Sequence, residues 1–133
     1  MAHEFPVRVY YEDTDLAGIV YYANYLKFIE RGRSEFIRAL GVDQVALKAN
    51  HGIVFAVRRV EADYLRPAKF DDQLMVVTEL VADTGARLVM DQAVTREGEI
   101  LFTATVTIVC LGEGGAPQRL PADMRRKLAP KLH

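Results

Sequence analysis

Residues 24–41, NYLKFIERGRSEFIRALG, predict one long helix. Hydrophobic residues and one glycine recur every three or four positions, which places them on one helical face: Tyr25, Phe28, Ile29, Gly32, Phe36, Ile37 and Leu40. Gly41 is a helix stop, and Arg31 and Glu35 have the spacing of an i,i+4 ion pair. A glycine within a helix costs about 1 kcal/mol relative to alanine. Gly32 therefore predicts that another backbone, such as that of a sheet, passes close to this face.

Extended segments lie on both sides of this helix in the sequence. Alternating hydrophobic residues predict strands at 5–9, 53–64, 74–81, 87–96 and 100–108. In the second of these strands the alternation changes phase at Arg58-Arg59, which predicts a bulge or a bend. A short helix is expected at 42–49, and a helical turn at 121–128.

The connections between the last three strands are short. Asp83-Thr84-Gly85 and Glu97-Gly98 are turn sequences, so the strands that flank them should pair antiparallel. The predicted fold class is α+β, with a curved antiparallel five-stranded sheet wrapped around one long central helix. The length of 133 residues fits a single domain, 1–133.

The composition excludes several classes of protein. Lys and Arg number 17 against 18 Asp and Glu, and a net charge of −1 argues against a nucleic-acid-binding protein. The single cysteine, Cys110, excludes an intramolecular disulfide and fits a reducing compartment. No apolar run approaches the roughly 18–20 residues that span a bilayer, and the first eight residues lack a signal-peptide pattern. We therefore expect no membrane span and a cytoplasmic location.

The segment 11–25, YEDTDLAGIVYYANY, is the best candidate for a functional site. It combines three acids, one glycine and four tyrosines beside a helix start. Acids at this position can simply cap the helix or interact with its dipole. A metal site is a weak alternative, because no histidine or further acid lies at ligand spacing from Asp13 and Asp15.

The same residues carry a resemblance to a known family. Asp13-Thr14-Asp15-Leu16-Ala17-Gly18-Ile19-Val20-Tyr21-Tyr22-Ala23-Asn24-Tyr25 resembles the signature of the 4-hydroxybenzoyl-CoA thioesterase family. The match is closest to the tol-pal-associated acyl-CoA thioesterase branch, because the segments 8–12, 28–35 and 63–68 fit that branch as well. The resemblance implies a hotdog fold and hydrolysis of the thioester bond of acyl-CoA to a free acid and coenzyme A.

The resemblance also implies roles for single residues. The catalytic carboxylate falls on Asp15, as nucleophile or general base, and the amide that polarises the thioester carbonyl falls on the backbone N–H of Tyr22. A helix N-terminus suits the second task, because its free N–H groups and partial positive charge stabilise an oxyanion. The substrate-binding positions expected in addition are Gly18, Val20, Tyr21 and Asn24, with Arg58, Arg59 and Arg87 for the phosphates of coenzyme A. No cofactor or metal is expected, since coenzyme A is part of the substrate.

Partners and alternative functions follow from the same reading. A sheet with valine and tyrosine on both faces predicts a homodimer or homotetramer, and the branch implies acyl-carrier protein as a further partner. One alternative is a hotdog hydroxyacyl dehydratase, which generally uses a histidine with an acid, but His51 does not sit in such a motif. Another is a non-catalytic protein that binds acyl groups or acyl-carrier protein. A serine triad is not expected, since Ser34 is the only serine, and Cys110 reads as a buried thiol.

Overall fold

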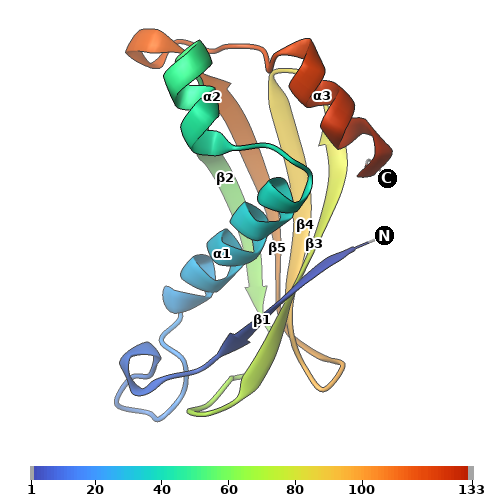
Figure 1. Ribbon diagram of the computed structural model, residues 1–133. Helices are drawn as coiled ribbons and strands as arrows, with labels where there is room; N and C mark the ends of the chain where they lie inside the picture. The colour runs from blue at the N-terminus through green and yellow to red at the C-terminus, as the bar shows by residue number, and fades with distance from the viewer. Residues whose placement is uncertain (1, 132–133) are drawn as a thin grey trace.

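The computed structural model describes residues 2–131, which form one five-stranded antiparallel sheet with helices on one side (Figure 1). The strand order is β1-β3-β4-β5-β2. The strands are β1 (His3–Arg8), β2 (Val54–Tyr64), β3 (Gln73–Asp83), β4 (Arg87–Arg96) and β5 (Glu99–Leu111). The α-helices are α1 (Asn24–Ala39), α2 (Gln44–His51) and α3 (Ala122–Leu128). Three single 3-10 turns complete the described chain, at Tyr11–Asp13, Glu113–Gly115 and Ala129–Lys131.

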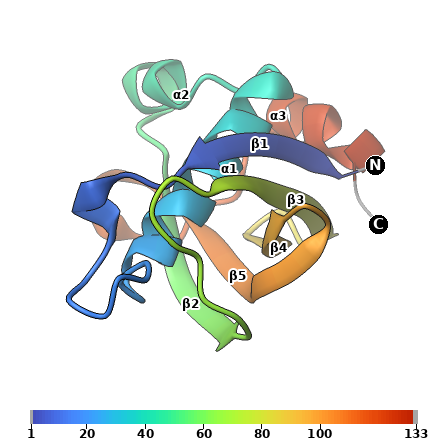
Figure 2. The same ribbon diagram turned by 90° about the horizontal axis from the view of Figure 1, so that it is seen from below.

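Helix α1 lies along the concave face of the curved sheet (Figures 1 and 2). Its buried residues are the predicted face except for Leu40, which follows the last helical residue and is only partly buried. The expected ion pair between Arg31 and Glu35 is wrong. Glu35 instead accepts from Arg38 one turn later, and the Arg31 guanidinium lies 6.0 Å from the centre of the Phe28 ring.

Gly32 marks the closest approach of α1 to the sheet. A Cβ atom at this position would lie 2.4 Å from Cγ1 of Val76 and 3.6 Å from Oγ1 of Thr78, both on β3. The prediction of a sheet across this helical face is confirmed, although the nearest atoms belong to side chains and not to backbone. The cost of a glycine in the helix is therefore offset by closer packing of α1 on β3.

A Gly32→Ala variant should lower the free energy of unfolding by about 1–3 kcal/mol, because its methyl group overlaps Val76. In a helix without this contact the same substitution would stabilise by about 1 kcal/mol. Urea denaturation measures the change. Adding Val76→Ala should recover part of the loss, and a stabilised single variant would contradict the packing argument.

The phase change in β2 produces a continuous apolar face. The register between β2 and β5 shifts between Val57 and Arg59, so the predicted bulge is confirmed. Val57 pairs with Ile108 and Val60 pairs with Val106, and both partners point into the core. The bulge therefore turns the two sequence phases of β2 toward the same side, which faces α1.

The two edges of the sheet differ in their capacity to pair further. β1 has six residues and contains Pro6, which blunts an edge because it has no N–H to donate. β2 has 11 residues, contains no proline, and exposes Val54, Val57, Val60 and Tyr64 by 37–49%. Within the described chain β2 pairs only with β5, so its other side is a free edge.

Candidate functional site

The predicted catalytic residue Asp15 lies in a tight loop. Thr14 and Val20 form an antiparallel bridge, and the Asp15 N–H donates to the Ile19 carbonyl at 3.0 Å. Gly18 has a φ of 79°, a conformation that favours glycine, and its N–H donates to the Asp15 carbonyl at 3.0 Å. Gly18 therefore allows the chain to reverse after Asp15, as its predicted turn requires.

The Asp15 carboxylate is exposed in the single chain. Its Oδ1 accepts from the Ala17 N–H at 3.0 Å, which fixes the side chain in an Asx turn. Oδ2 accepts no hydrogen bond from residues 2–131. The adjacent Leu16 side chain is fully exposed. One carboxylate oxygen is thus oriented by the loop, while the other has no partner among the described residues.

The loop is tied to the start of α1 through one carbonyl. The Asp13 oxygen accepts from the Tyr21 N–H and from the Asn24 side-chain amide, both at 2.9 Å. The Asn24 amide is therefore engaged with the loop and not directed at a ligand. These two hydrogen bonds fix the position of the Asp15 loop relative to the first turn of α1.

The N-terminus of α1 presents free donors. Its N-cap residue is Ala23, which has no side chain that can accept from the helix, and no side-chain cap is formed. The Tyr21 carbonyl accepts from the Asn24 N–H at 2.8 Å, while the N–H groups of Tyr22 and Ala23 donate to no group within residues 2–131. Free N–H groups at a helix start can donate to an anion.

Three aromatic rings pack together beside the helix start. Tyr25 stacks on Phe102 with ring centroids 5.0 Å apart, and Tyr64 packs edge-on against both. The Tyr64 hydroxyl donates to the Tyr22 carbonyl at 3.1 Å. Sequence reasoning assigned no role to Tyr64 or Phe102, since neither lies near the helix in the sequence.

The loop after β2, which contains Ala68 and Lys69, supports the Asp15 loop through backbone contacts. The Val20 N–H donates to the Ala68 carbonyl at 2.8 Å, and Ile19 forms a bridge with Lys69. The Ala68 N–H in turn donates to the hydroxyl of Tyr25 at 3.0 Å. Val20, predicted to bind substrate, is 3% exposed, so its side chain belongs to the core and only its backbone supports the loop.

Asp72 and Arg96 hold this supporting loop on β4. Arg96 donates to Oδ2 of Asp72 at 2.8 Å and to the Pro67 carbonyl at 3.3 Å. The Lys69 N–H donates to the same carboxylate at 2.8 Å. Burial by itself would raise the pKa of Asp72, but the Lys69 N–H and the Arg96 guanidinium together hold this pKa below its ordinary value.

An Asp72→Asn variant should lower the free energy of unfolding by about 1 kcal/mol near pH 7. Because the pKa of Asp72 is lowered on folding, the carboxylate stabilises the fold above its unfolded pKa of about 4. This contribution disappears as the pH falls through the folded pKa, so the two proteins should converge at an acid pH below that pKa.

Urea denaturation at both pH values measures this dependence. Asp71→Asn is the matched control, because Asp71 pairs with Arg8 at 2.9 Å but its side chain is 66% exposed, and its effect should be smaller. An equal loss at both pH values for Asp72→Asn would contradict the role of its charge.

The predicted phosphate-binding arginines lie elsewhere. Arg58 and Arg59 are exposed at the bulge of β2, and Nε of Arg59 lies 3.6 Å from Glu61. Arg87 is exposed at the start of β4, at the end of the sheet opposite the start of α1 (Figure 1). A single chain therefore does not bring these side chains together with Asp15 and Tyr22.

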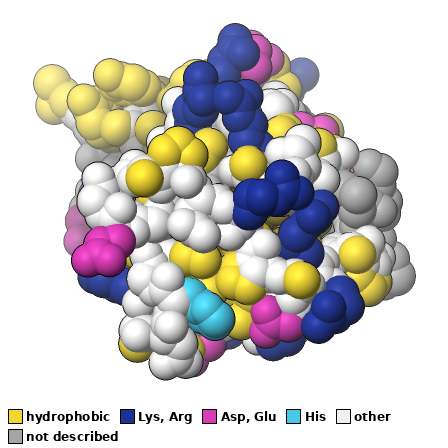
Figure 3. Space-filling model, turned by 90° about the horizontal axis from the view of Figure 1, so that it is seen from above, with side chains coloured by type: hydrophobic (Ala, Val, Ile, Leu, Met, Phe, Trp, Pro, Cys, Tyr) yellow, Lys and Arg dark blue, Asp and Glu magenta, His cyan; other side chains and the backbone are white. Residues whose placement is uncertain are grey.

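The turn at Gly85, two residues before Arg87, has basic neighbours that the sequence did not predict. A Cβ atom at Gly85, in the turn between β3 and β4, would lie 2.6 Å from Nη2 of Arg119 and 3.2 Å from Cζ of Arg125. Lys and Arg side chains gather on this end of the molecule (Figure 3). An acidic residue, Asp83, also lies at this turn, 3.7 Å from Nε of Arg125.

The other possible nucleophiles have ordinary surroundings. Cys110 is 2% exposed, and burial raises the pKa of its thiol to about 11, so the thiol is not ionised near neutral pH. The Ser34 hydroxyl donates to Glu30 at 2.8 Å within α1. His51 is exposed at the end of α2.

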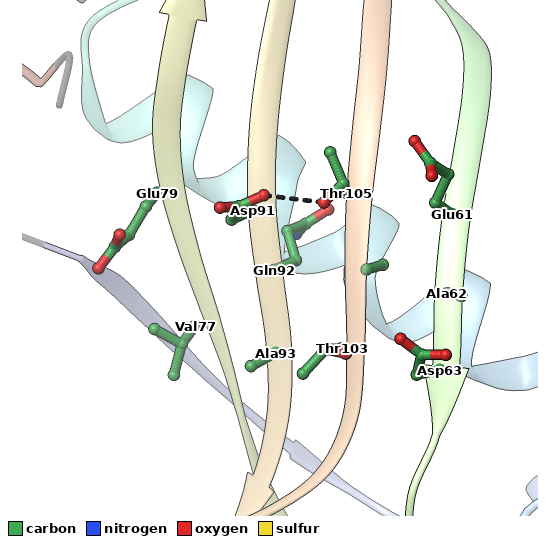
Figure 4. Close-up of a pocket in the computed structure, with 11 residues that line it drawn as sticks. Glu61, Ala62, Asp63, Val77, Glu79, Asp91, Gln92, Ala93, Thr103 and Thr105 are labelled. Carbon is green, nitrogen blue, oxygen red and sulfur yellow. Dashed lines mark hydrogen bonds between the residues drawn. The ribbon is translucent and has the colours of Figure 1, made fainter.

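A hollow on the outer face of the sheet contains none of the predicted site residues (Figure 4). It has four carboxylates on three strands, from Glu61, Asp63, Glu79 and Asp91. Such a face repels the phosphates of coenzyme A. Within residues 2–131 there is no group of three His, Cys, Asp or Glu side chains that could hold a metal ion. None of the described helices is long and apolar enough to cross a membrane.

The sheet order, the central helix and the loop before it define a hotdog-fold protein. Residues 9–128 match the model of the Thioesterase-like superfamily, and the chain belongs to this family. The predicted fold and the predicted family are therefore both confirmed.

Relatives cover most of the chain. An acyl-CoA thioesterase YbgC of Haemophilus influenzae is 44% identical over 91% of this chain and 90% of its own length. An acyl-CoA thioester hydrolase YbgC of Escherichia coli is 39% identical over 96% and 89%. The crystal structure of a probable thioesterase from Bartonella henselae superposes with a TM-score of 0.87 at 41% identity, over 91% of this chain and all of that one.

Proposed function

We propose that this protein hydrolyses acyl-CoA thioesters, so that acyl-CoA and water give a free acid and coenzyme A. The observation that carries the proposal is the uncapped start of α1, where the Tyr22 N–H has no partner within residues 2–131. This helix start is tied through the Asp13 carbonyl to the loop of the exposed Asp15. The names of the relatives support the same substrate class.

The chemistry needs a donor and a carboxylate. As a nucleophile adds to the thioester carbon, the carbonyl oxygen takes up an electron pair, and the Tyr22 N–H donates to this oxyanion. The C–S bond then breaks, and the thiolate of coenzyme A leaves and takes a proton. A thiolate leaves more readily than an amine or an alkoxide. The mechanism therefore uses no serine, cysteine, metal or cofactor.

Asp15 has two possible parts in this reaction. As a nucleophile, its oxygen attacks the carbonyl carbon, and water then cleaves the resulting mixed anhydride. As a general base, it takes a proton from the water that attacks directly. A single turnover in H₂¹⁸O tests the first route, since ¹⁸O in the Asp15 carboxylate indicates an anhydride that water opens at the Asp15 carbon, whereas ¹⁸O only in the product acid shows that water attacked the acyl carbon.

A panel of acyl-CoAs tests the function itself. Short, long and aromatic acyl-CoAs are supplied, and free thiol is measured. Release of thiol from one or more members supports hydrolysis. Binding without thiol release would instead indicate a non-catalytic acyl-binding protein. Formation of an enoyl thioester from a hydroxyacyl-CoA would indicate a dehydratase.

The working unit in this proposal is a homodimer that pairs through β2. A free edge of 11 residues with exposed valines is a ready template for another strand, whereas β1 is short and contains Pro6. Two copies paired antiparallel through β2 place the start of α1 in one subunit at the same end as the turn between β3 and β4 in the other. Residues of both subunits then line one site.

This arrangement gives the arginines a part in substrate binding. In the proposed dimer Arg58 and Arg59 flank the interface between the subunits. Arg87 approaches the site from the subunit that does not supply Asp15. These three side chains are proposed to bind the phosphates of coenzyme A, since the overall net charge of −1 provides no general attraction for an anionic substrate. A higher KM in each Arg→Ala variant, with unchanged kcat, is the expected readout.

Acyl-carrier protein is proposed as a second acyl donor, because it presents its acyl group on the same kind of thioester. Comparing thiol release from acyl-carrier protein and from the matching acyl-CoA tests this directly. The proposed location is the cytoplasm, which the single buried Cys110 fits. Cell fractionation checks the location.

A further inference from the structure

Tyr64 contacts the proposed oxyanion donor from a distant part of the chain. It is the last residue of β2, and its hydroxyl donates to the Tyr22 carbonyl at 3.1 Å, across 42 sequence positions. The Tyr22 carbonyl and the Tyr22 N–H belong to the two peptide units that flank the same Cα atom. Only the φ and ψ angles of Tyr22 separate these two units, so holding the carbonyl limits the backbone conformations of Tyr22 and with them the direction of its N–H.

The Tyr22 carbonyl lies outside the hydrogen-bond pattern of α1. In an α-helix the Leu26 N–H would bond to the Tyr22 carbonyl, four residues before it. It bonds instead to the Ala23 carbonyl at 3.2 Å, while the Tyr22 carbonyl accepts from Tyr64. The Tyr22 carbonyl is therefore bonded to β2 and not to the helix.

The Tyr64 ring is itself held in place. Its centroid lies 5.0 Å from that of Phe102 and 5.5 Å from that of Tyr25, in edge-to-face arrangements. Burial raises the pKa of Tyr64, so its hydroxyl stays protonated and remains a donor near neutral pH. A donor that is already oriented before the reaction needs no rearrangement when charge develops on the substrate.

We propose that Tyr64 is a positioning residue for thioester hydrolysis, which holds the Tyr22 carbonyl so that the Tyr22 N–H points at the carbonyl oxygen of the substrate. This inference rests on the function proposed above for Tyr22. It adds a residue at the end of the edge strand β2 to those that orient the proposed oxyanion donor. Tyr64 itself touches no reacting atom in this arrangement.

A Tyr64→Phe variant removes the hydroxyl and keeps the ring. We expect kcat to fall about five- to tenfold, as for loss of one hydrogen bond of about 1 kcal/mol, with KM unchanged. Tyr11→Phe is the matched control, because Tyr11 is 79% exposed, stacks on Phe70 and also loses only a hydroxyl. It should keep both constants, and both variants should keep the thermal midpoint within about 3 °C.

NMR spectroscopy can observe the Tyr22–Ala23 peptide directly. Tyr22-Ala23 is the only Tyr-Ala pair in the sequence, so ¹³C-carbonyl tyrosine with ¹⁵N-alanine labels this peptide alone. In Tyr64→Phe its carbonyl and amide signals should shift, whereas in Tyr11→Phe they should stay in place. A merely structural role of the Tyr64 ring would move neither signal, because the ring is retained.

The outcomes separate this inference from the proposed function. Shifted signals with a lower kcat support the positioning role. Unshifted signals, or shifted signals with an unchanged kcat, overturn it, while thioester hydrolysis by the unmodified protein still supports the proposed function. An unmodified protein that releases no thiol from any acyl-CoA would overturn both.

Discussion

An Asp15→Asn variant should fold normally and lose at least about 10²-fold in turnover, which is the lower end for a positioned acid or base. The amide keeps the size of the side chain and can still accept from the Ala17 N–H through its oxygen, so the loop should stay intact. It is neither a nucleophile nor a base at neutral pH. The loss should appear in kcat and not in KM, because the carboxylate acts on the reacting carbon and is not needed for binding.

Thiol release under saturating acyl-CoA measures this effect. Glu12→Gln is the matched control, since Glu12 is an exposed acid three residues earlier in the same segment. It should keep most of the turnover. Near-normal turnover in a folded Asp15→Asn protein would remove Asp15 from the mechanism and leave the family assignment in place.

A Val60→Lys variant should convert the proposed dimer into monomers. Val60 lies on the side of β2 that faces α1 and is 38% exposed in the single chain, so the lysine is tolerated in the monomer. At a subunit interface the lysine charge would be removed from water without an acidic partner. An uncompensated buried charge costs about 3–5 kcal/mol, which raises the Kd of the dimer at least about 10²-fold.

Sedimentation velocity and thiol release test this prediction together. Turnover should fall with the dimer fraction and recover at high protein concentration, if two subunits line each site. Val45→Lys, on α2 and 80% exposed, is the control and should remain dimeric and active. A monomer with full activity would contradict the shared site, and a dimer that persists would move the interface away from β2.

Much of the fold could be predicted because local patterns report local structure. The period of about 3.6 between Tyr25 and Ile37 identified α1 and its buried face, and α1 begins at the predicted Asn24. The turn at Glu97-Gly98 has φ values of 50° and 81°, as a two-residue hairpin requires. Strand ends differ by up to three residues, as at β5, which continues past Ile108 to Leu111 because it pairs along its whole length.

The candidate site was predicted in part. Asp15, Gly18 and Tyr22 could be identified because they follow one another in a short signature. The sequence could not show that Val20 is buried or that the Asn24 amide bonds to the loop, because an exposed and a buried position look alike within an irregular segment. Arg119 and Arg125 at the turn of Gly85 were missed because they are distant in sequence and carry no pattern.

The sequence by itself determined the family, the long helix with its buried face, and the segment that contains the carboxylate and the helix start. The tertiary structure alone decided which edge strand is free, and that both phases of β2 face α1. It also decided that Tyr64 meets Tyr22 and that Arg87 lies at the far end from Asp15. The physical reason is that periodicity reflects the backbone state and burial of neighbouring residues. Contacts across dozens of positions depend instead on strand order and register, and here one bulge sets the register of β2.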